Sequence, residues 1–178
     1  MNPEKVKYDK LYSLGSYGPI TRYGHTNHGK PWMNHILEFQ PKSLLDVGCG
    51  YNEFVKEVRE NKFIEDSWGI DFSCTGADQN CDILELPFPD KRWDFITAFD
   101  VMEHLLPEQV SPSLKEMKRV SKRFSFTISF KKSILEEYGM ILHPTIWPPK
   151  TWIKEIEKAG GKLWEYKDHF FIGEWKDI

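Results

Sequence analysis

Two glycines and two acidic residues in the first half of the chain are spaced as in sites that bind a nucleoside. The segment Asp46-Val47-Gly48-Cys49-Gly50 ends a short apolar run, and Asp71 lies at the end of the next one. Glycines at such a turn let a ligand approach the backbone, and the amides that open a following helix attract negatively charged groups. An acid at the position of Asp71 can accept hydrogen bonds from both ribose hydroxyls of an adenosine group. The pattern therefore predicts a site for a nucleoside-containing cofactor.

The residues after the turn discriminate between two classes of cofactor. A dinucleotide site has a third glycine in the pattern G-x-G-x-x-G, and Glu53 occupies that position here. Its carboxylate would repel a pyrophosphate, which counts against a nicotinamide-dependent oxidoreductase. S-adenosylmethionine carries no phosphate, so its methionine portion can lie across the turn while its ribose reaches Asp71. An NAD-dependent oxidoreductase is kept as the alternative enzyme.

Histidines are the candidate bases for removing a proton from a hydroxyl or amine acceptor, because imidazole titrates near neutral pH. His104 directly follows the fourth predicted strand, where a structural role is at least as plausible. His143 lies in the loop after the fifth predicted strand, which commonly faces an acceptor pocket in this kind of sheet. His143 is therefore the preferred catalytic candidate and His104 the second.

The N-terminal segment supplies candidate acceptor-binding residues, which together with His143 are Tyr17, Tyr23 and His25. Its glycines and tyrosines suit a lid that closes over a cofactor, although an inert tail would have a similar sequence. His25 and His28 have no carboxylate or cysteine beside them, so the sequence predicts no metal site.

Alternating strand and helix patterns position these residues. Strands are predicted at residues 43–47, 67–72, 80–84, 93–101, 124–130, 163–166 and 170–175. Helices are predicted from Pro31 to before Pro41, from Phe54 onward, from an N-cap at Ser111 with Pro112 in the first turn, and from Pro149 to Gly160. The order predicts an α/β Rossmann-like fold, a mostly parallel seven-stranded sheet with helices on both faces and a C-terminal antiparallel strand.

Two details of this pattern are unusual for such a sheet. The stretch between Asp71 and Asp82 is too short for a full crossover helix, so that helix is predicted to be truncated and the sheet edge exposed or covered by another subunit. In residues 124–130, Phe124, Phe126, Ile128 and Phe130 alternate with serine and threonine. A strand covered on both faces is usually apolar at every position.

Size and composition limit the class of protein. The 178 residues fit one domain, with 1–28 predicted as a loosely structured arm or lid and 29–178 as the cofactor-binding domain. No run approaches the roughly 18 apolar residues of a membrane span, and residues 1–10 lack the apolar core of a signal peptide. A cytoplasmic protein without a membrane partner is therefore expected. The three cysteines form no CxxC pair, which predicts reduced thiols.

Four segments in order resemble class I S-adenosylmethionine-dependent methyltransferases. Residues 44–50 resemble the signature loop of that family, and residues 69–73 resemble its acidic ribose-binding segment. Residues 82–90 are similar to the adenine-binding loop, and residues 93–105 to the fourth strand and its exit in the subgroup called type 11. The resemblance covers roughly a third of the chain.

The resemblance implies a set of cofactor-binding residues, which are Asp46, Gly48, Cys49, Gly50, Asp71, Phe72, Asp82, Ile83, Phe99 and Asp100. The turn would contact the methionine portion, with Asp46 supporting it. Asp71 would bind the ribose and Phe72 would stack near the adenine. The Asp82 carboxylate and the Ile83 amide would bind the adenine edge.

Phe99 and Asp100 would then lie beneath the sulfonium. One departure from the family is Tyr51-Asn52, where many relatives have a glycine or another small residue. We expect these two residues to give the pocket for the cofactor's carboxylate a different shape from the family's.

The function that the resemblance implies is methyl transfer from S-adenosylmethionine to an oxygen or nitrogen atom of a small molecule, with S-adenosylhomocysteine as product. A net charge of −3 and the lack of an Asn/Asp-Pro-Pro-aromatic or Pro-Cys segment count against a nucleic-acid acceptor. A non-catalytic cofactor-binding partner subunit is a further alternative. The sequence does not decide between a monomer and a homodimer.

Overall fold

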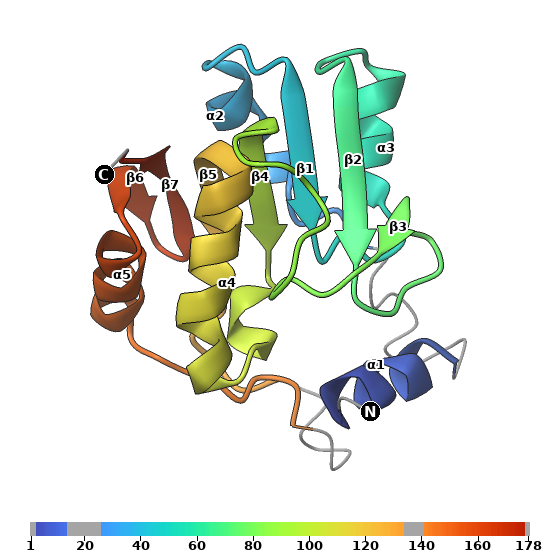
Figure 1. Ribbon diagram of the computed structural model, residues 1–178, viewed down its shortest axis with the longest axis vertical. Coiled ribbons are helices and arrows are strands. Elements are labelled where there is room, and N and C mark those ends of the chain that lie inside the picture. Colours follow the sequence, from blue (N-terminus) through green and yellow to red (C-terminus); the bar gives the residue numbers. More distant parts are fainter. Residues whose placement is uncertain (1–2, 14–25, 134–140, 177–178) are drawn as a thin grey trace.

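The computed structural model describes residues 3–13, 26–133 and 141–176, folded around one seven-stranded sheet (Figure 1). The strands are β1 Ser43–Val47, β2 Asp66–Asp71, β3 Gln79–Asn80, β4 Trp93–Phe99, β5 Ser121–Thr127, β6 Gly161–Lys167 and β7 Phe170–Trp175. They lie in the order β3-β2-β1-β4-β5-β7-β6. Strands β1 to β5 pair in parallel, and β7 is antiparallel to both β5 and β6. The predicted fold class is confirmed.

Helices cover both faces of this sheet. In chain order they are α1 Pro3–Ser13, η1 Lys30–Trp32, α2 Met33–Leu37, α3 Glu53–Glu60, η2 Met102–His104, α4 Pro107–Val120 and α5 Pro149–Lys158, where η marks a 3-10 turn. Helices α2 and α3 bury their apolar stripes in one core, around Ile36, Phe54 and Phe95. Helices α4 and α5 contribute Leu114 and Trp152 to the other core, and Figure 1 shows α4 in front of the sheet.

Helix α4 begins earlier than predicted. Its first residue is Pro107, and Leu106 is the N-cap, whose backbone N–H donates to the Gln109 side chain at 2.9 Å. The prediction that Ser111 caps the helix was wrong because proline also suits the first turn at position 107. Pro112 therefore lies inside the helix.

The short connection between β2 and β3 is confirmed. Residues 72–78 form a loop without a helix, and β3 has only two residues, both exposed, where the sequence predicted a strand at 80–84. This edge of the sheet is therefore thin.

The serine and threonine alternation in β5 has a structural explanation. Phe124 and Phe126 pack in the core against Trp175, while Ser125 and Thr127 on the opposite side are also buried. The Thr127 hydroxyl donates to Asp100 Oδ1 at 2.9 Å and accepts from the Asp100 backbone N–H at 2.9 Å. One hydroxyl of the alternation thus positions an acid at the end of β4.

Helix α1 lies beyond the carboxyl ends of β1, β2 and β4 (Figure 1). The sequence predicted a loosely structured arm here, whereas residues 3–13 form a helix whose Leu11 is fully buried. The rest of the predicted arm up to residue 25 lies outside the described residues. Among the described residues, no helix combines the length and the apolar character that a membrane crossing requires.

Candidate active site

The glycine turn connects β1 to α3 and is hydrogen-bonded to the end of β2 through Cys49 and Gly50. Gly48 and Gly50 have φ values of +69° and +54°, which favour glycine. A Cβ added at Gly48 would come within 2.5 Å of Val101 Cγ2, so the turn and the exit of β4 are in close contact. The Gly50 N–H donates to Asp71 Oδ2 at 3.0 Å, which links two of the predicted site residues directly.

Asp71 is buried and accepts several hydrogen bonds. Besides Gly50, its carboxylate accepts from the backbone N–H groups of Ser73 at 2.9 Å and Cys74 at 2.8 Å. The Tyr12 hydroxyl of α1 lies 3.4 Å from Asp71 Oδ2. Asp71 therefore orders both loops around it, a structural function that its position in the sequence did not reveal.

Asp46 is a second buried acid beneath the turn. Its Oδ1 accepts a hydrogen bond from the Thr97 hydroxyl at 2.7 Å. Burial, with a smaller contribution from the negative charge of Asp71, raises the pKa of Asp46 to about 7. Burial and the same two acids raise the pKa of the Cys49 thiol, so Cys49 stays protonated. The turn thus lies in an environment of negative charge.

Asp100 is the third acid at this end of the sheet. It has a φ of +55°, and its Oδ2 lies 2.9 Å from His28 Nδ1. The hydrogen bond that His28 donates to Asp100 raises the pKa of His28. Burial alone would raise the pKa of Asp100, but His28 and Thr127 outweigh it and hold that pKa below its ordinary value. The sequence noted His28 in the arm without predicting this pair.

The residues predicted to surround the adenine and the sulfonium lie in the loops beside these acids. Phe72 is half-buried, with Lys5 Nζ of α1 5.7 Å from its ring centre. Asp82 Oδ1 accepts from the Leu84 N–H at 3.0 Å, which is turn chemistry, and the Ile83 side chain packs into the core. Phe99 contacts Phe54 edge-on, with ring centres 5.0 Å apart. Their roles toward a cofactor stay predictions.

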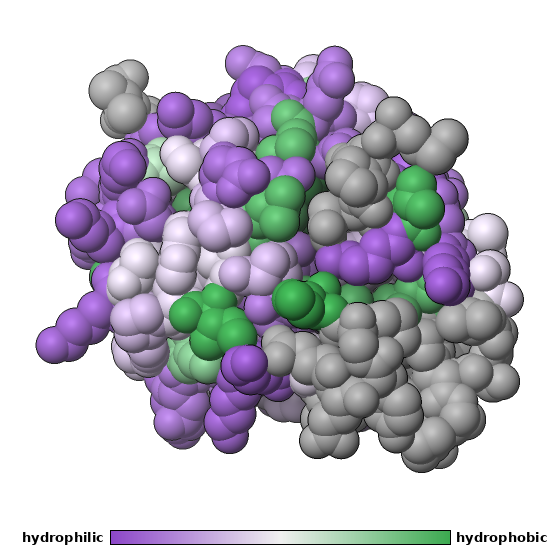
Figure 2. All heavy atoms as spheres, turned by 90° about the horizontal axis from the view of Figure 1, so that it is seen from below, coloured by the Kyte–Doolittle hydropathy of each residue, from purple (hydrophilic) through white to green (hydrophobic). Residues whose placement is uncertain are grey.

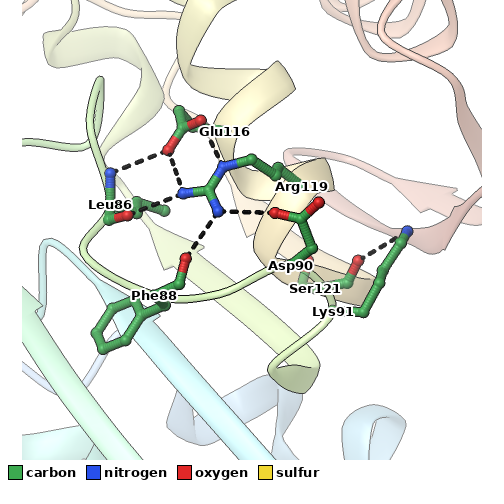
Figure 3. Close-up of polar contacts among 7 residues, drawn as sticks. All are labelled: Leu86, Phe88, Asp90, Lys91, Glu116, Arg119 and Ser121. Carbon is green, nitrogen blue, oxygen red and sulfur yellow. Dashed lines mark hydrogen bonds and ion pairs between the residues drawn. The ribbon is translucent and has the colours of Figure 1, made fainter.

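One arginine holds the loop that carries Asp82 and Ile83. The Arg119 guanidinium, on α4, donates to the carbonyls of Leu86 and Phe88 at 2.8 and 2.7 Å (Figure 3). It also pairs with Glu116, whose Oε2 accepts from the Leu86 N–H at 3.0 Å. No motif in the sequence indicates this network, because it depends on contacts between residues about 30 positions apart.

The two candidate bases lie side by side, with ring centres 4.7 Å apart. His104 Nδ1 is 2.7 Å from the Tyr8 hydroxyl, and burial together with His143 lowers the pKa of His104 to about 3. His143 Nδ1 lies 2.6 Å from the Lys131 carbonyl. Glu103, which the sequence did not single out, is fully buried beside them, and burial followed by the charge of Asp100 raises its pKa to about 8.

The three predicted acceptor-binding residues of the arm, Tyr17, Tyr23 and His25, lie outside the described residues. Two other tyrosines of the N-terminal segment, Tyr8 and Tyr12, contact the site instead. Figure 2 views this end of the molecule and shows hydrophobic patches between hydrophilic residues.

Comparison with known proteins agrees with this geometry. A family model described as a methyltransferase domain matches residues 30–125, more than half of the chain. Among curated proteins, the probable tRNA methyltransferase 9B of Mus musculus is 28% identical over 134 residues, which are 67% of this chain but 29% of that protein. The chain therefore spans less than a third of this relative.

Solved structures share the fold. The PH0226 protein of Pyrococcus horikoshii superimposes with a TM-score of 0.69 at 15% identity, covering 96% of this chain and 99% of that one. The 1,6-didemethyltoxoflavin-N1-methyltransferase of Burkholderia thailandensis, solved with its substrate and S-adenosylhomocysteine, gives 0.68 at 13% identity, covering 99% and 92%. On the family match and the sheet order, the chain belongs to the class I S-adenosylmethionine-dependent methyltransferase domains.

Proposed function

We propose that this chain binds S-adenosylmethionine and transfers its methyl group to an oxygen or nitrogen atom of a small molecule. The observation that carries the proposal is that Asp71 and Asp100 lie beside the Gly48–Gly50 turn, where Asp71 accepts from the Gly50 N–H and the pKa of Asp100 is held low. Such negative charge suits a ligand with a sulfonium and an ammonium group, and it disfavours the pyrophosphate of a dinucleotide. The family assignment and the acids thus favour the same cofactor.

In this proposal each loop binds one part of the cofactor. The turn from Gly48 to Gly50 holds the methionine portion, Asp71 the ribose, and the loop at Asp82 and Ile83 the adenine. The Tyr12 hydroxyl donates to Asp71 in the structure. When the cofactor binds, a ribose hydroxyl replaces Tyr12 as the donor to Asp71. The bound cofactor supplies an electrophilic methyl group, and the protein aligns and desolvates the acceptor.

We propose that α1 acts as a lid over the site. Its side chains reach three separate loops at this end of the sheet, with Tyr8 on His104, Lys5 over Phe72, and Lys7 Nζ 3.1 Å from the Ile141 carbonyl. A helix attached to all three loops can exclude water from the space between them.

An acceptor with a hydroxyl or ammonium group must lose a proton. His143 suits this role better than His104, because the carbonyl of Lys131 can only accept a hydrogen bond. The proton of His143 is therefore on Nδ1, and Nε2 has a free lone pair. His104, with its pKa lowered to about 3, is too weak a base at neutral pH.

A transfer RNA is the second candidate acceptor. The likeness to the probable tRNA methyltransferase 9B favours it. The net charge of −3 counts against it, because RNA binding depends on basic surfaces. A methyl-transfer assay with total tRNA and with a panel of small hydroxyl and amine compounds separates the two.

The first experiment is calorimetric titration of the full chain with S-adenosylhomocysteine, S-adenosylmethionine and NAD. We expect binding in the micromolar range, about −8 kcal/mol, for the first two ligands and none for NAD. Asp71→Asn removes one charge and one acceptor, and it should weaken binding at least tenfold.

The matched control is Asp94→Asn. Asp94 also accepts backbone and lysine hydrogen bonds, but it lies at the opposite end of β4. Its substitution should leave the affinity unchanged, and a thermal melt of each variant reports whether it is folded. Binding of NAD without S-adenosylhomocysteine would overturn the proposal.

A further inference from the structure

Glu103, His104 and His143 form a compact cluster just beyond the carboxyl end of β4. One oxygen of Glu103 and one nitrogen of each histidine all lie within 4.8 Å of one another. Two residues of the cluster come from η2, and the third comes from a loop almost 40 residues later. The Thr145 N–H donates to the Glu103 carbonyl at 3.3 Å, and the Thr145 hydroxyl to the Leu105 carbonyl at 2.6 Å, which holds that loop against η2.

Glu103 has an unsatisfied oxygen in this cluster. Its Oε1 accepts from the Ser129 N–H at 2.9 Å, whereas Oε2 is buried and has no hydrogen-bond partner among the described residues. A buried carboxylate oxygen without a partner costs free energy, because it has lost its hydration and gained nothing in return. Oε2 is therefore an unused donor atom that faces the two histidines.

Each histidine places one ring nitrogen in this cluster. The Lys131 carbonyl fixes the proton of His143 on Nδ1, so that Nε2 carries a lone pair. This arrangement, in which the far nitrogen donates to a carbonyl, is the usual one for histidines that bind metals. The Tyr8 hydroxyl, 2.7 Å from His104 Nδ1, orients the ring of His104.

We propose that Glu103, His104 and His143 bind a divalent transition-metal ion. Two imidazoles and one carboxylate are a donor set that Zn²⁺ and Fe²⁺ take in catalytic sites, where further positions stay open for water or substrate. In a tetrahedral site with bonds of about 2.1 Å, donor atoms lie about 3.4 Å apart. The three side chains therefore need to move together by about an ångström. The sequence predicted no metal site, because the pattern around His25 and His28 was the only one weighed.

The catalytic meaning of the site rests on the proposed function. A hydroxyl oxygen of the acceptor would occupy an open position on the ion, which lowers the pKa of that hydroxyl. Its proton passes to solvent, and the oxygen lone pair forms the new bond to the methyl carbon. The bonding pair between carbon and sulfur stays on sulfur, which gives S-adenosylhomocysteine. In the metal-bound state His143 is a ligand rather than the base, and hydroxyl acceptors are favoured over amines.

The test is metal binding by the untagged full chain, which does not depend on activity. Co²⁺ titration followed by visible absorption, and Zn²⁺ titration followed by calorimetry, should each show one site. Glu103→Gln keeps the acceptor for Ser129 and removes the charge, and His143→Gln removes one donor from a partly exposed loop. Each should weaken binding at least a hundredfold. His35→Gln, a partly exposed histidine on α2, should bind like wild type.

Each outcome decides between the two proposals. If wild type binds S-adenosylhomocysteine but neither metal, the metal site is overturned and the proposed function stands. Metal binding that survives both His143→Gln and Glu103→Gln would also overturn the assignment. If wild type binds metal at these residues but no S-adenosylhomocysteine, the metal site stands and the proposed function fails.

Discussion

Asp46 gives the protein a pH dependence that a single substitution can isolate. Burial raises its pKa from 3.8 to about 7. Between these values the folded chain holds a proton that the unfolded chain has released, so the free energy of unfolding falls as pH rises. The slope is at most about 1.4 kcal/mol per pH unit. Glu103, with its pKa of about 8, contributes in the same direction.

We expect Asp46→Asn to flatten this dependence between pH 5 and pH 7, because asparagine still accepts from Thr97 and does not titrate. Urea unfolding at several pH values measures the slope. Asp94→Asn is the control, since the pKa of Asp94 is lowered and both its states are ionised across this window. An unchanged slope in Asp46→Asn would show that other groups dominate.

The proximity of single residues was predictable where short motifs carried them. Gly50 and Asp71 were predicted as parts of one site, and a 3.0 Å hydrogen bond joins them. Glu103 was missed because its chemistry depends on burial and on Ser129 and His143, which are distant in sequence. The only available signal was its place beside His104.

At the scale of elements, α4 holds the predicted adenine loop through Arg119. Arg119→Lys keeps the charge but loses the planar fork that reaches the Leu86 and Phe88 carbonyls together. We expect a loss of about 1–2 kcal/mol in the free energy of unfolding, faster hydrogen exchange at residues 84–90, and several-fold weaker binding of S-adenosylhomocysteine.

Arg92→Lys is the matched control, because Arg92 pairs with Asp66 on the surface and stacks on Trp93 instead of holding a loop. It should cost less than about 1 kcal/mol and leave the affinity unchanged. Equal hydrogen-exchange rates at residues 84–90 in wild type and Arg119→Lys would show that the loop keeps its conformation without the Arg119 hydrogen bonds.

Helices and strands with a clear periodicity of apolar residues were predicted well, but their first and last residues were predicted less well. The strand before the glycine turn was placed correctly at 43–47. The fifth strand begins three residues earlier than predicted, because pairing with β4 brings in Ser121, Lys122 and Arg123 despite their polarity. Pairing across a sheet is not visible in the pattern of one strand.

At the scale of the whole molecule, α1 should respond to cofactor binding as a lid. We expect hydrogen exchange in residues 3–13 to slow when S-adenosylhomocysteine binds, because the ligand would add contacts beneath a helix already attached to three loops. Mass spectrometry of exchange measures this, with α5 as the internal control. Faster exchange in α1 would show instead that the helix competes with the cofactor.

The overall architecture was predictable because alternating strands and helices admit few arrangements. The order of elements predicted a parallel sheet with a closing antiparallel strand, and the structure confirms it. The helix α1 was not predictable, because its sequence has no apolar stripe and Leu11 alone is fully buried among residues 5–13, whose burial the structure describes. Its position depends on polar contacts with distant loops.

The two-residue strand β3 also affects how copies of this chain meet one another. An open sheet edge can accept a strand from another molecule, which starts aggregation. Here the edge presents only Gln79 and Asn80, and the Asn80 amide already donates to the carbonyls of Asp71 and Cys74. A strand added from another molecule would gain few backbone hydrogen bonds and little apolar contact. The connection that left no room for a helix thus leaves a poor template for edge-to-edge association.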